Sequence, residues 1–394
     1  MIQLVSAGIL TAVVAFATAF AIVLAGLDAA GASQAEAASG LFVLSAFTGL
    51  MSIAFSIRLR MPVMLAWSTP AAVLLIATGA HDGGFPVAVG AFIGAGVLTL
   101  IAGIWRPFGR AVAAIPMPLA NAMLAGILLD ICLAPVRAVA ELPTLALPIV
   151  LAWAVTLRFA RFYAVPVAVL VTAVMVGIST PLPSATSIGL PSLVPVMPVF
   201  SFDVMVGLAL PLFIVSMASQ AIPGLAVLRA NGYRPAVGPI FTASGLVGVA
   251  TAFFGAHSYA LAAITAALAA GPEAHPDPAR RWVATVVAGV AYVILGLGAA
   301  YAAAFVAQTP PLLIQAVAGL ALLGSIGSSL ASAVAEEEVR LPAVITFITT
   351  ASGLSFFGVS AAFWGLVAGG ALMAIMRFRA KPASERHLPQ SEDI

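Results

Sequence analysis

Apolar stretches recur from one end of the chain to the other, and they decide in which solvent it can fold. Hydrophobic residues make up 62% of the 394 positions and charged residues only 8%. A soluble domain carries about 25% charged residues and cannot hide this much apolar side chain from water. A membrane-spanning helix needs about 20 mostly apolar residues. The sequence therefore predicts an all-α polytopic membrane protein without a separate soluble domain.

Fourteen hydrophobic segments are predicted to cross the membrane. They cover residues 6–27, 40–57, 61–79, 85–105, 110–130, 142–157, 163–180, 203–222, 236–254, 256–270, 281–306, 310–334, 341–355 and 357–376. The first lacks the basic start and small-residue cleavage site of a signal peptide, so we expect it to remain as a span.

The basic residues predict the orientation of these spans. With the N-terminus in the cytoplasm and strict alternation, 15 of the 16 Lys and Arg residues fall on the cytoplasmic side, and only Arg137 falls outside. Positive charge in short cytoplasmic loops is the main determinant of topology. We therefore expect a multi-pass protein of a bacterial-type inner membrane with both termini in the cytoplasm. Because the basic residues flank spans, we expect no nucleic-acid partner.

The two halves of the chain resemble each other. A proline-rich stretch at residues 181–202 separates residues 1–195 from residues 196–380, and residues 381–394 are expected to form a disordered cytoplasmic tail. Seven spans in each half is an odd number, so the second half would enter from the opposite side, as in the inverted repeats of secondary transporters. The matches are Gly49 with Gly245 (245 − 49 = 196), Gly79 with Gly271 (192) and Pro118 with Pro311 (193).

The third and tenth segments are predicted to be interrupted in mid-membrane. Thr69 before Pro70 is typical of a helix start, with a hydroxyl N-cap and proline in the first turn. We expect a short extended stretch before it and a half-helix after it, to Gly79. In the tenth segment we expect residues 255–259 to be extended and residues 261–270 to be helical. The alternative is an ordinary helix kinked by Pro62 and Pro70.

Two half-helix N-termini facing one midplane site would favour an anion, because free backbone N–H groups carry partial positive charge there. No Asp, Glu, Lys or Arg lies at the centre of a predicted span, and His257 is the only histidine there. His257 either carries a proton and binds a carboxylate, or is a neutral, hydrogen-bonded histidine. The predicted binding residues are Trp67, Ser68, Thr69, Ser219, Gln220, His257, Ser258 and Tyr259.

Several of these residues also have a purely structural interpretation. Trp67 and Tyr259 either stack on a flat substrate or are ordinary core aromatics, and Gln220 either binds substrate or joins helices. The single cysteine, Cys132, excludes an intramolecular disulfide and a cysteine-based zinc site, and we expect no metal and no cofactor. The chain contains no His-Glu-x-x-His or Gly-x-Ser-x-Gly motif, so an enzyme is not expected.

At these residues the sequence resembles the BenE-type benzoate/proton symporters. The resemblance covers nearly the whole chain and is carried by residues 66–70, 121–126, 257–267, 272–281 and 349–353. It implies uptake of a small aromatic carboxylate with a proton. Its wider relatives, the nucleobase and sulfate permeases, imply a core domain of spans 1–4 and 8–11, a gate domain of spans 5–7 and 12–14, and a homodimer.

The sequence departs from the nucleobase relatives at the proton-coupling positions. Those relatives carry acidic residues in spans 8 and 10, where this chain has Ser219, Gln220, His257 and Ser258. We therefore expect a benzoate-like substrate, with the proton on His257 or on the substrate itself. The alternatives are another small anion, such as sulfate or another organic acid, or a nucleobase on the same fold.

Overall fold

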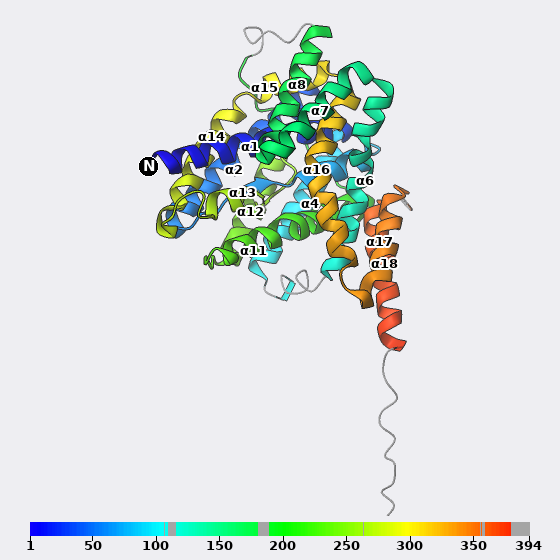
Figure 1. Cartoon of the computed structure of the whole chain (residues 1–394). Coiled ribbons are helices and arrows are strands. Elements are labelled where there is room, and N and C mark those ends of the chain that lie inside the picture. The colour runs from blue at the N-terminus through cyan, green and yellow to red at the C-terminus, as the bar shows by residue number, and fades with distance from the viewer. Residues whose placement is uncertain are drawn as a thin grey trace, which may run out of the picture.

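The computed structural model describes residues 1–105, 107–108, 116–179, 189–262, 264–354, 356 and 359–379. Figure 1 shows that these residues form a bundle of helices, most of which lie side by side. The start of the predicted fifth span, residues 110–115, lies outside the described part of the chain. So do residues 181–188 of the proline-rich stretch and the predicted tail, residues 381–394.

The first half of the chain contains seven helices and one strand within the described residues. They are α1 (Ile2–Ala29), α2 (Gln34–Leu59), β1 (Leu65–Trp67), α3 (Thr69–Thr78), α4 (Phe85–Ile104), α6 (Met117–Glu141), α7 (Pro143–Phe159) and α8 (Ala164–Ser179), with a short 3₁₀ turn at Arg161–Tyr163.

The second half begins with a continuous helical rod, Phe202–Ala230, which includes two π-helical turns, η2 (Met205–Ala209) and η3 (Met217–Ala221). Its α-helical parts are α9 (Phe202–Val204), α10 (Leu210–Ser216) and α11 (Ile222–Ala230). The rest is α12 (Val237–Ala252), β2 (Tyr259–Leu261), α13 (Ile264–Ala270), a 3₁₀ turn at Pro278–Arg280, α14 (Trp282–Gly296), α15 (Ala299–Gln308), α16 (Pro311–Val334), α17 (Glu337–Ala351) and α18 (Ala361–Arg379).

Within the described residues, eight helices are long and apolar enough to cross a membrane. The other apolar helices have 10 to 17 residues, among them α3 and α12. The predicted span 281–306 consists of two helices rather than one, because the chain breaks between α14 and α15. The N–H of Leu297 and that of Gly298 donate to carbonyls three residues back, Ile294 and Leu295, which ends α14 in a tight turn.

Two glycines allow helices to touch backbone to backbone. A Cβ on Gly49 of α2 would collide with the carbonyl oxygen of Gly289 on α14, and a Cβ on Gly245 of α12 would collide with the backbone N of Leu100 on α4. Small residues permit this close approach between helices in lipid. Gly49 and Gly245 are the pair that the sequence matched between the two halves.

The helices pack in two groups. In one, α2 packs on α14, α4 on α12, and α1 on α3 and α14. In the other, α6 packs on α16 and α17, α7 on α8, and α17 on α18. Figure 1 shows α17 and α18 at one side of the molecule, next to α6 and away from α14. Contacts of α16 with α1 and of α6 with α3 join the groups.

The two predicted interruptions are present, and they pair with each other. β1 and β2 form a two-stranded antiparallel sheet with Leu65 opposite Leu261, Ala66 opposite Ala260 and Trp67 opposite Tyr259. The hydroxyl of Ser52 on α2 accepts a hydrogen bond from the N–H of Leu65 at 2.9 Å. Backbone that leaves the helical conformation at membrane depth must be satisfied inside the protein, and this pairing does so.

The first half-helix begins at Thr69 as expected but with a different N-cap, and the second begins later than expected. Ser68, rather than Thr69, is the N-cap of α3, and its hydroxyl accepts from the N–H of Ala71 at 3.2 Å. The second half-helix begins at Ile264 rather than at Leu261. The reason is tertiary, because Leu261 is held in β2 by its pairing with Leu65. Ser258 and Tyr259 therefore lie on an extended segment before α13 and not at its start.

Candidate functional site

A small buried cavity lies where the extended segment before α13 meets α4, α10 and α12. It is lined by Ala95, Gly96 and Thr99 of α4, by Leu212, Phe213 and Ser216 of α10, by Ser244 and Gly248 of α12, and by His257, Ser258 and Tyr259. His257 is the only one of these side chains that can carry a positive charge, and none of them is acidic. The cavity is thus a neutral, mostly apolar chamber with a few hydroxyl groups and one imidazole.

His257 is almost completely enclosed, with 1% of its surface exposed. Its Nδ1 lies 3.0 Å from the hydroxyl oxygen of Ser258. Its Nε2 is buried and has no hydrogen-bond partner. The ring of Phe92, on α4, packs edge-on against the imidazole with the ring centroids 6.2 Å apart. One imidazole nitrogen is therefore held by the protein, while the other is available to a ligand.

Ser258 links His257 to the long helical rod. The hydroxyl of Ser216 on α10 donates to Oγ of Ser258 over 3.4 Å. Ser216 lies directly before the π-helical turn η3. Such turns displace side chains from their usual α-helical direction and occur often at functional sites. Ser216, Ser258 and His257 therefore form one hydrogen-bonded chain along the cavity wall.

Tyr259 anchors the extended segment to two helices. Its hydroxyl lies 3.1 Å from Oγ1 of Thr251 on α12 and donates to the carbonyl oxygen of Val43 on α2 at 3.3 Å. Tyr259 is buried, with 3% of its surface exposed. Buried tyrosine hydroxyls usually find such partners. This anchor fixes the segment that carries His257 and Ser258.

The free space in the cavity accepts about one water molecule and no aromatic ring. A substrate of the size of benzoate therefore needs α4, α10, α12 or the extended segment to move before it can enter. The π-helical turns in the rod and the breaks in the interrupted segments lie next to this chamber.

Three of the eight predicted binding residues, His257, Ser258 and Tyr259, line the cavity. The other five do not belong to its lining. The indole of Trp67 packs edge-on against Phe16 and Tyr292, with centroid distances of 6.0 and 5.3 Å. Trp67 is nevertheless the direct cross-strand partner of Tyr259. It therefore lies one strand away from the cavity.

The remaining predicted residues lie on the flanking helices. Ser68 and Thr69 begin α3, with the hydroxyl of Ser68 used as the N-cap. Ser219 and Gln220 lie in η3, where the hydroxyl of Ser219 donates to the carbonyl of Val215 at 2.6 Å. Ser219 and Gln220 are only partly buried. They follow Ser216 on the same rod by one turn.

The sequence did not single out Thr99 and Ser244, which the structure adds to the candidate site. Thr99 is 7% exposed and donates to the carbonyl of Ala95. Ser244 is 3% exposed and its hydroxyl has no partner. Hydroxyl residues are common in membrane helices, so neither residue stood out in the sequence as a candidate for the site. A weak signal existed for Ser244, because it precedes Gly245, the residue matched with Gly49.

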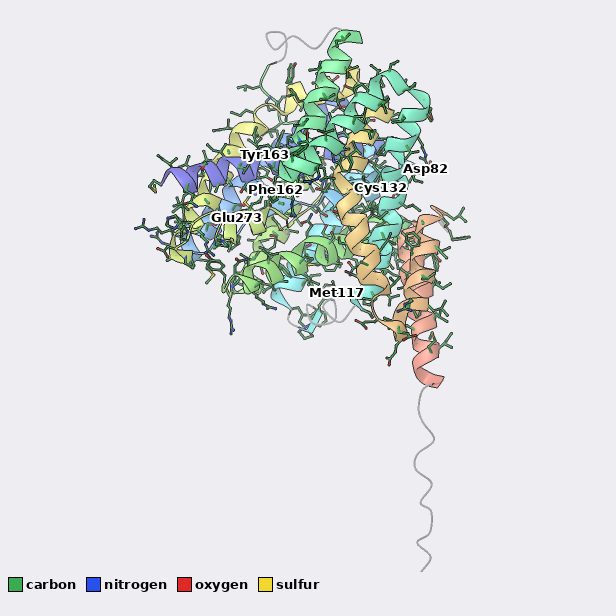
Figure 2. The ribbon with its side chains drawn as sticks, viewed as in Figure 1. Asp82, Met117, Cys132, Phe162, Tyr163 and Glu273 are labelled. Atoms are coloured by element: carbon green, nitrogen blue, oxygen red, sulfur yellow. The ribbon has the colours of Figure 1, made fainter. Side chains whose placement is uncertain are left out.

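The fixed charges and the cysteine lie elsewhere. In the described part of the chain, the ion pairs join Arg137 to Asp130 and Arg280 to Asp277, and both are exposed. The described residues contain no cluster of three or more side chains suited to a metal. Cys132 is buried on α6, beside α16 (Figure 2), with its Sγ 3.9 Å from the carbonyl oxygen of Gly319. We assign Cys132 a packing role.

Sequence comparison places this architecture among known proteins. The chain matches the family described as BenE, benzoate membrane transport protein, over residues 1–375. It is 38% identical to the inner membrane protein YdcO of Escherichia coli (strain K12) over 372 residues, which are 94% of this chain and 95% of that protein. It is 34% identical to the benzoate membrane transport protein of Acinetobacter baylyi over 367 residues, 92% of each chain.

Solved structures share the fold at low sequence identity. SLC26A9 matches with a TM-score of 0.66 and 16% identity, over 97% of this chain and 66% of the longer SLC26A9 chain. The transmembrane domain of the cyanobacterial bicarbonate transporter BicA matches with a TM-score of 0.57 and 16% identity, over 96% of this chain and 98% of that domain. With the full-length match to the family, these comparisons confirm the resemblance seen in the sequence: the chain is a multi-pass membrane protein that belongs to the BenE family of benzoate membrane transport proteins.

Proposed function

We propose that this protein is a secondary active transporter that imports benzoate or a similar small aromatic carboxylate together with a proton. The observation that carries the proposal is the cavity around His257 in a chain of the BenE family. A buried imidazole nitrogen without a partner, in a chamber without acidic side chains, suits the carboxylate of an apolar acid. The relative from Acinetobacter baylyi is named as a benzoate transport protein.

We propose transport by alternating access between the two groups of helices. The helices α1–α4 and α9–α15 would form the core domain, and α6–α8 and α16–α18 the gate domain. The packing supports a seven-plus-seven inverted repeat of residues 1–195 and 196–380. In such a repeat α2 corresponds to α12 and α14 to α4, so the contact of α2 with α14 and that of α12 with α4 are equivalent.

In this scheme the core and gate groups move apart, and α4, α10, α12 or the extended segment also shifts within the core so that the substrate can enter. The carboxylate would lie near His257 and Ser258, with Tyr259 beside it. The ring requires more space than the closed cavity offers. Movement of the rod would bring Ser219 and Gln220 toward this space, and movement around β1 would bring Trp67, Ser68 and Thr69 toward it. These five residues are proposed to complete the site in the open state.

The proton is proposed to travel on His257 or on the substrate. His257 is the side chain of this cavity that can take up and release a proton. We also propose an inner-membrane location, both termini in the cytoplasm, and a homodimer. The name of the Escherichia coli relative supports the inner membrane, and the distribution of basic residues supports the orientation.

The direct test is uptake of radiolabelled benzoate by purified protein in liposomes. Protein-free liposomes are the control, because neutral benzoic acid crosses lipid unaided. We expect saturable uptake that unlabelled benzoate abolishes. Uptake equal to that of the protein-free liposomes, with folded protein present, would reject the proposal.

A second candidate is transport of another small anion. The fold matches that of a bicarbonate transporter, and the closed cavity is small. Competition against labelled benzoate separates the two. Inhibition by substituted benzoates and not by sulfate or bicarbonate supports the first proposal. Inhibition by sulfate or bicarbonate and not by substituted benzoates favours transport of another small anion.

A further inference from the structure

Two residues that line the same cavity each have a buried polar atom without a partner. Among the described residues, the buried side-chain atoms that lack a hydrogen-bond partner include the Oγ of Ser244 and the Nε2 of His257, and both residues line the cavity. Buried polar groups are normally paired, so an unpaired one calls for an explanation. A ligand that pairs both atoms at once would explain them.

The hydrogen-bonded chain along the wall decides what His257 offers to such a ligand. With Ser216 as the donor to Oγ of Ser258 at 3.4 Å, the proton of Ser258 is left for the Nδ1 of His257, 3.0 Å away. A neutral imidazole that accepts at Nδ1 carries its hydrogen on Nε2. His257 therefore presents an N–H donor to the cavity while it is neutral.

Ser244 offers a second hydrogen-bond donor from a different element of the cavity wall. Its hydroxyl lies on α12, whereas His257 lies on the extended segment before β2. A carboxylate oxygen accepts hydrogen bonds and donates none. Because no acidic side chain lines the cavity, nothing there repels it. Hydrogen bonds to a charged acceptor are stronger than those between neutral groups.

We propose that Ser244 Oγ and His257 Nε2 together bind one carboxylate group of the substrate as an anion, and that Ser258 and Ser216 position the imidazole as an N–H donor. This inference rests on the proposed function and adds a binding residue, Ser244, and two positioning residues. It also assigns the bound substrate its charge state, and of the two proton carriers proposed above it therefore favours His257 over the substrate. The neutral acid, whose hydroxyl is a donor, fits two donors less well than the carboxylate does.

The test compares two serines that share burial and the lack of a hydrogen-bond partner but differ in whether they line the cavity. Ser244 and Ser360 are both buried and both lack a hydrogen-bond partner, but Ser360 lies outside the cavity lining. Neither substitution by alanine removes a hydrogen bond from the ligand-free protein, so S244A and S360A should both fold. We expect S244A to raise the Kd of benzoate by about 10-fold or more, and S360A to change it by less than about 2-fold.

A neutral isostere separates the carboxylate contact from a general change in the cavity. Nitrobenzene has the shape of benzoate without its charge, so S244A should leave its weak binding unchanged. If wild-type protein binds benzoate and S244A binds it equally well, the subsite is overturned while the proposed function stands. If wild-type protein shows no saturable benzoate binding, the proposed function fails and the subsite fails with it.

The positioning role is tested by the protonation state of the imidazole. The chain has four histidines, so ¹⁵N-labelled histidine gives few signals, and H257N identifies that of His257. We expect an unprotonated Nδ1 and a protonated Nε2 in the wild type at neutral or higher pH. Loss of this tautomer in S258A, with a raised Kd for benzoate, supports the role. A protonated Nδ1 in the wild type would overturn it.

Discussion

Trp67 and Tyr259 are direct register partners in the antiparallel pair of strands at the centre of the protein. They are 192 positions apart (259 − 67 = 192), which is the spacing that also relates Gly79 to Gly271. Residues matched between the two halves of the chain are therefore paired across the two-stranded sheet. Tyr259 lines the cavity, whereas Trp67 packs in the aromatic cluster with Phe16 and Tyr292. The sheet thus links the candidate site to the helices of the first half.

The close contact at Gly49 should stabilise the folded protein. A Cβ at this position would collide with the carbonyl oxygen of Gly289, so we expect G49A to destabilise the protein by about 1–3 kcal/mol, as overpacking does. Gly324, on α16, is the matched control, because a Cβ there meets no atom within 4 Å. G324A should be neutral or slightly stabilising. Thermal unfolding in detergent measures both, and equal melting temperatures would contradict the packing.

Arg281 should stabilise the end of the second half-helix, and its neighbour should not. The guanidinium donates to the carbonyls of His275, Ala270 and Pro276 over 2.7, 2.8 and 3.2 Å, and Arg281 is 6% exposed. Ala270 is the last residue of α13. Lysine cannot reproduce these three hydrogen bonds of the guanidinium group. We therefore expect R281K to lower the free energy of unfolding by about 1–3 kcal/mol.

The neighbouring arginine provides the control for this prediction. The side chain of Arg280 is 66% exposed and lies 3.7 Å from the carboxylate of Asp277. Exposed pairs of this kind contribute at most about 1 kcal/mol. R280K should therefore unfold within a few degrees of the wild type. An equal loss of stability in R280K and R281K would argue against the buried hydrogen bonds as the cause.

His257 should determine how uptake depends on pH. If the imidazole carries the transported proton, H257Q removes the titrating group, and uptake of benzoate should lose its pH dependence. The comparison is with H81Q, which changes a half-buried histidine outside the cavity lining. An unchanged pH profile in H257Q with uptake retained would mean that the proton does not travel on His257.

Single introduced cysteines can test the predicted orientation of the chain in the membrane. Cys132 is the only cysteine of the chain, so C132S gives a background without thiols. Asp82 and Glu337 are both exposed, and the topology places Asp82 outside and Glu337 in the cytoplasm. A membrane-impermeant maleimide added to intact cells should label D82C and should label E337C only after permeabilisation. The opposite pattern would invert the topology.

Local sequence signals predicted much of this fold because they act over short distances. The apolar stretches, the proline at position 70 and the break before the second half-helix could all be read directly from the chain. Helix starts shifted where a contact over a long sequence distance intervened, as at Leu261, which pairs with Leu65. The split of α14 from α15 was missed because its glycine turn lies inside an unbroken apolar stretch.

The candidate site was predicted less completely than the fold. His257, Ser258 and Tyr259 stand out in sequence because polar and aromatic residues follow a glycine in mid-span. Ser244 and Thr99 became candidates only when their helices were placed around the cavity. A hydroxyl in a membrane helix can bond to its own backbone, as Thr99 does. Only the three-dimensional packing shows that Ser244 does not.

The most direct test of the account is uptake of benzoate against its gradient, driven by protons. Liposomes that contain the purified protein would be given an inward proton gradient at pH values where benzoate is ionised, beside protein-free liposomes under the same gradient. We predict that labelled benzoate accumulates at an initial rate well above the protein-free rate, and that a protonophore abolishes this excess. An initial rate equal to that of the protein-free liposomes, or uptake through the protein that ignores the proton gradient, would contradict proton-coupled import of an aromatic carboxylate.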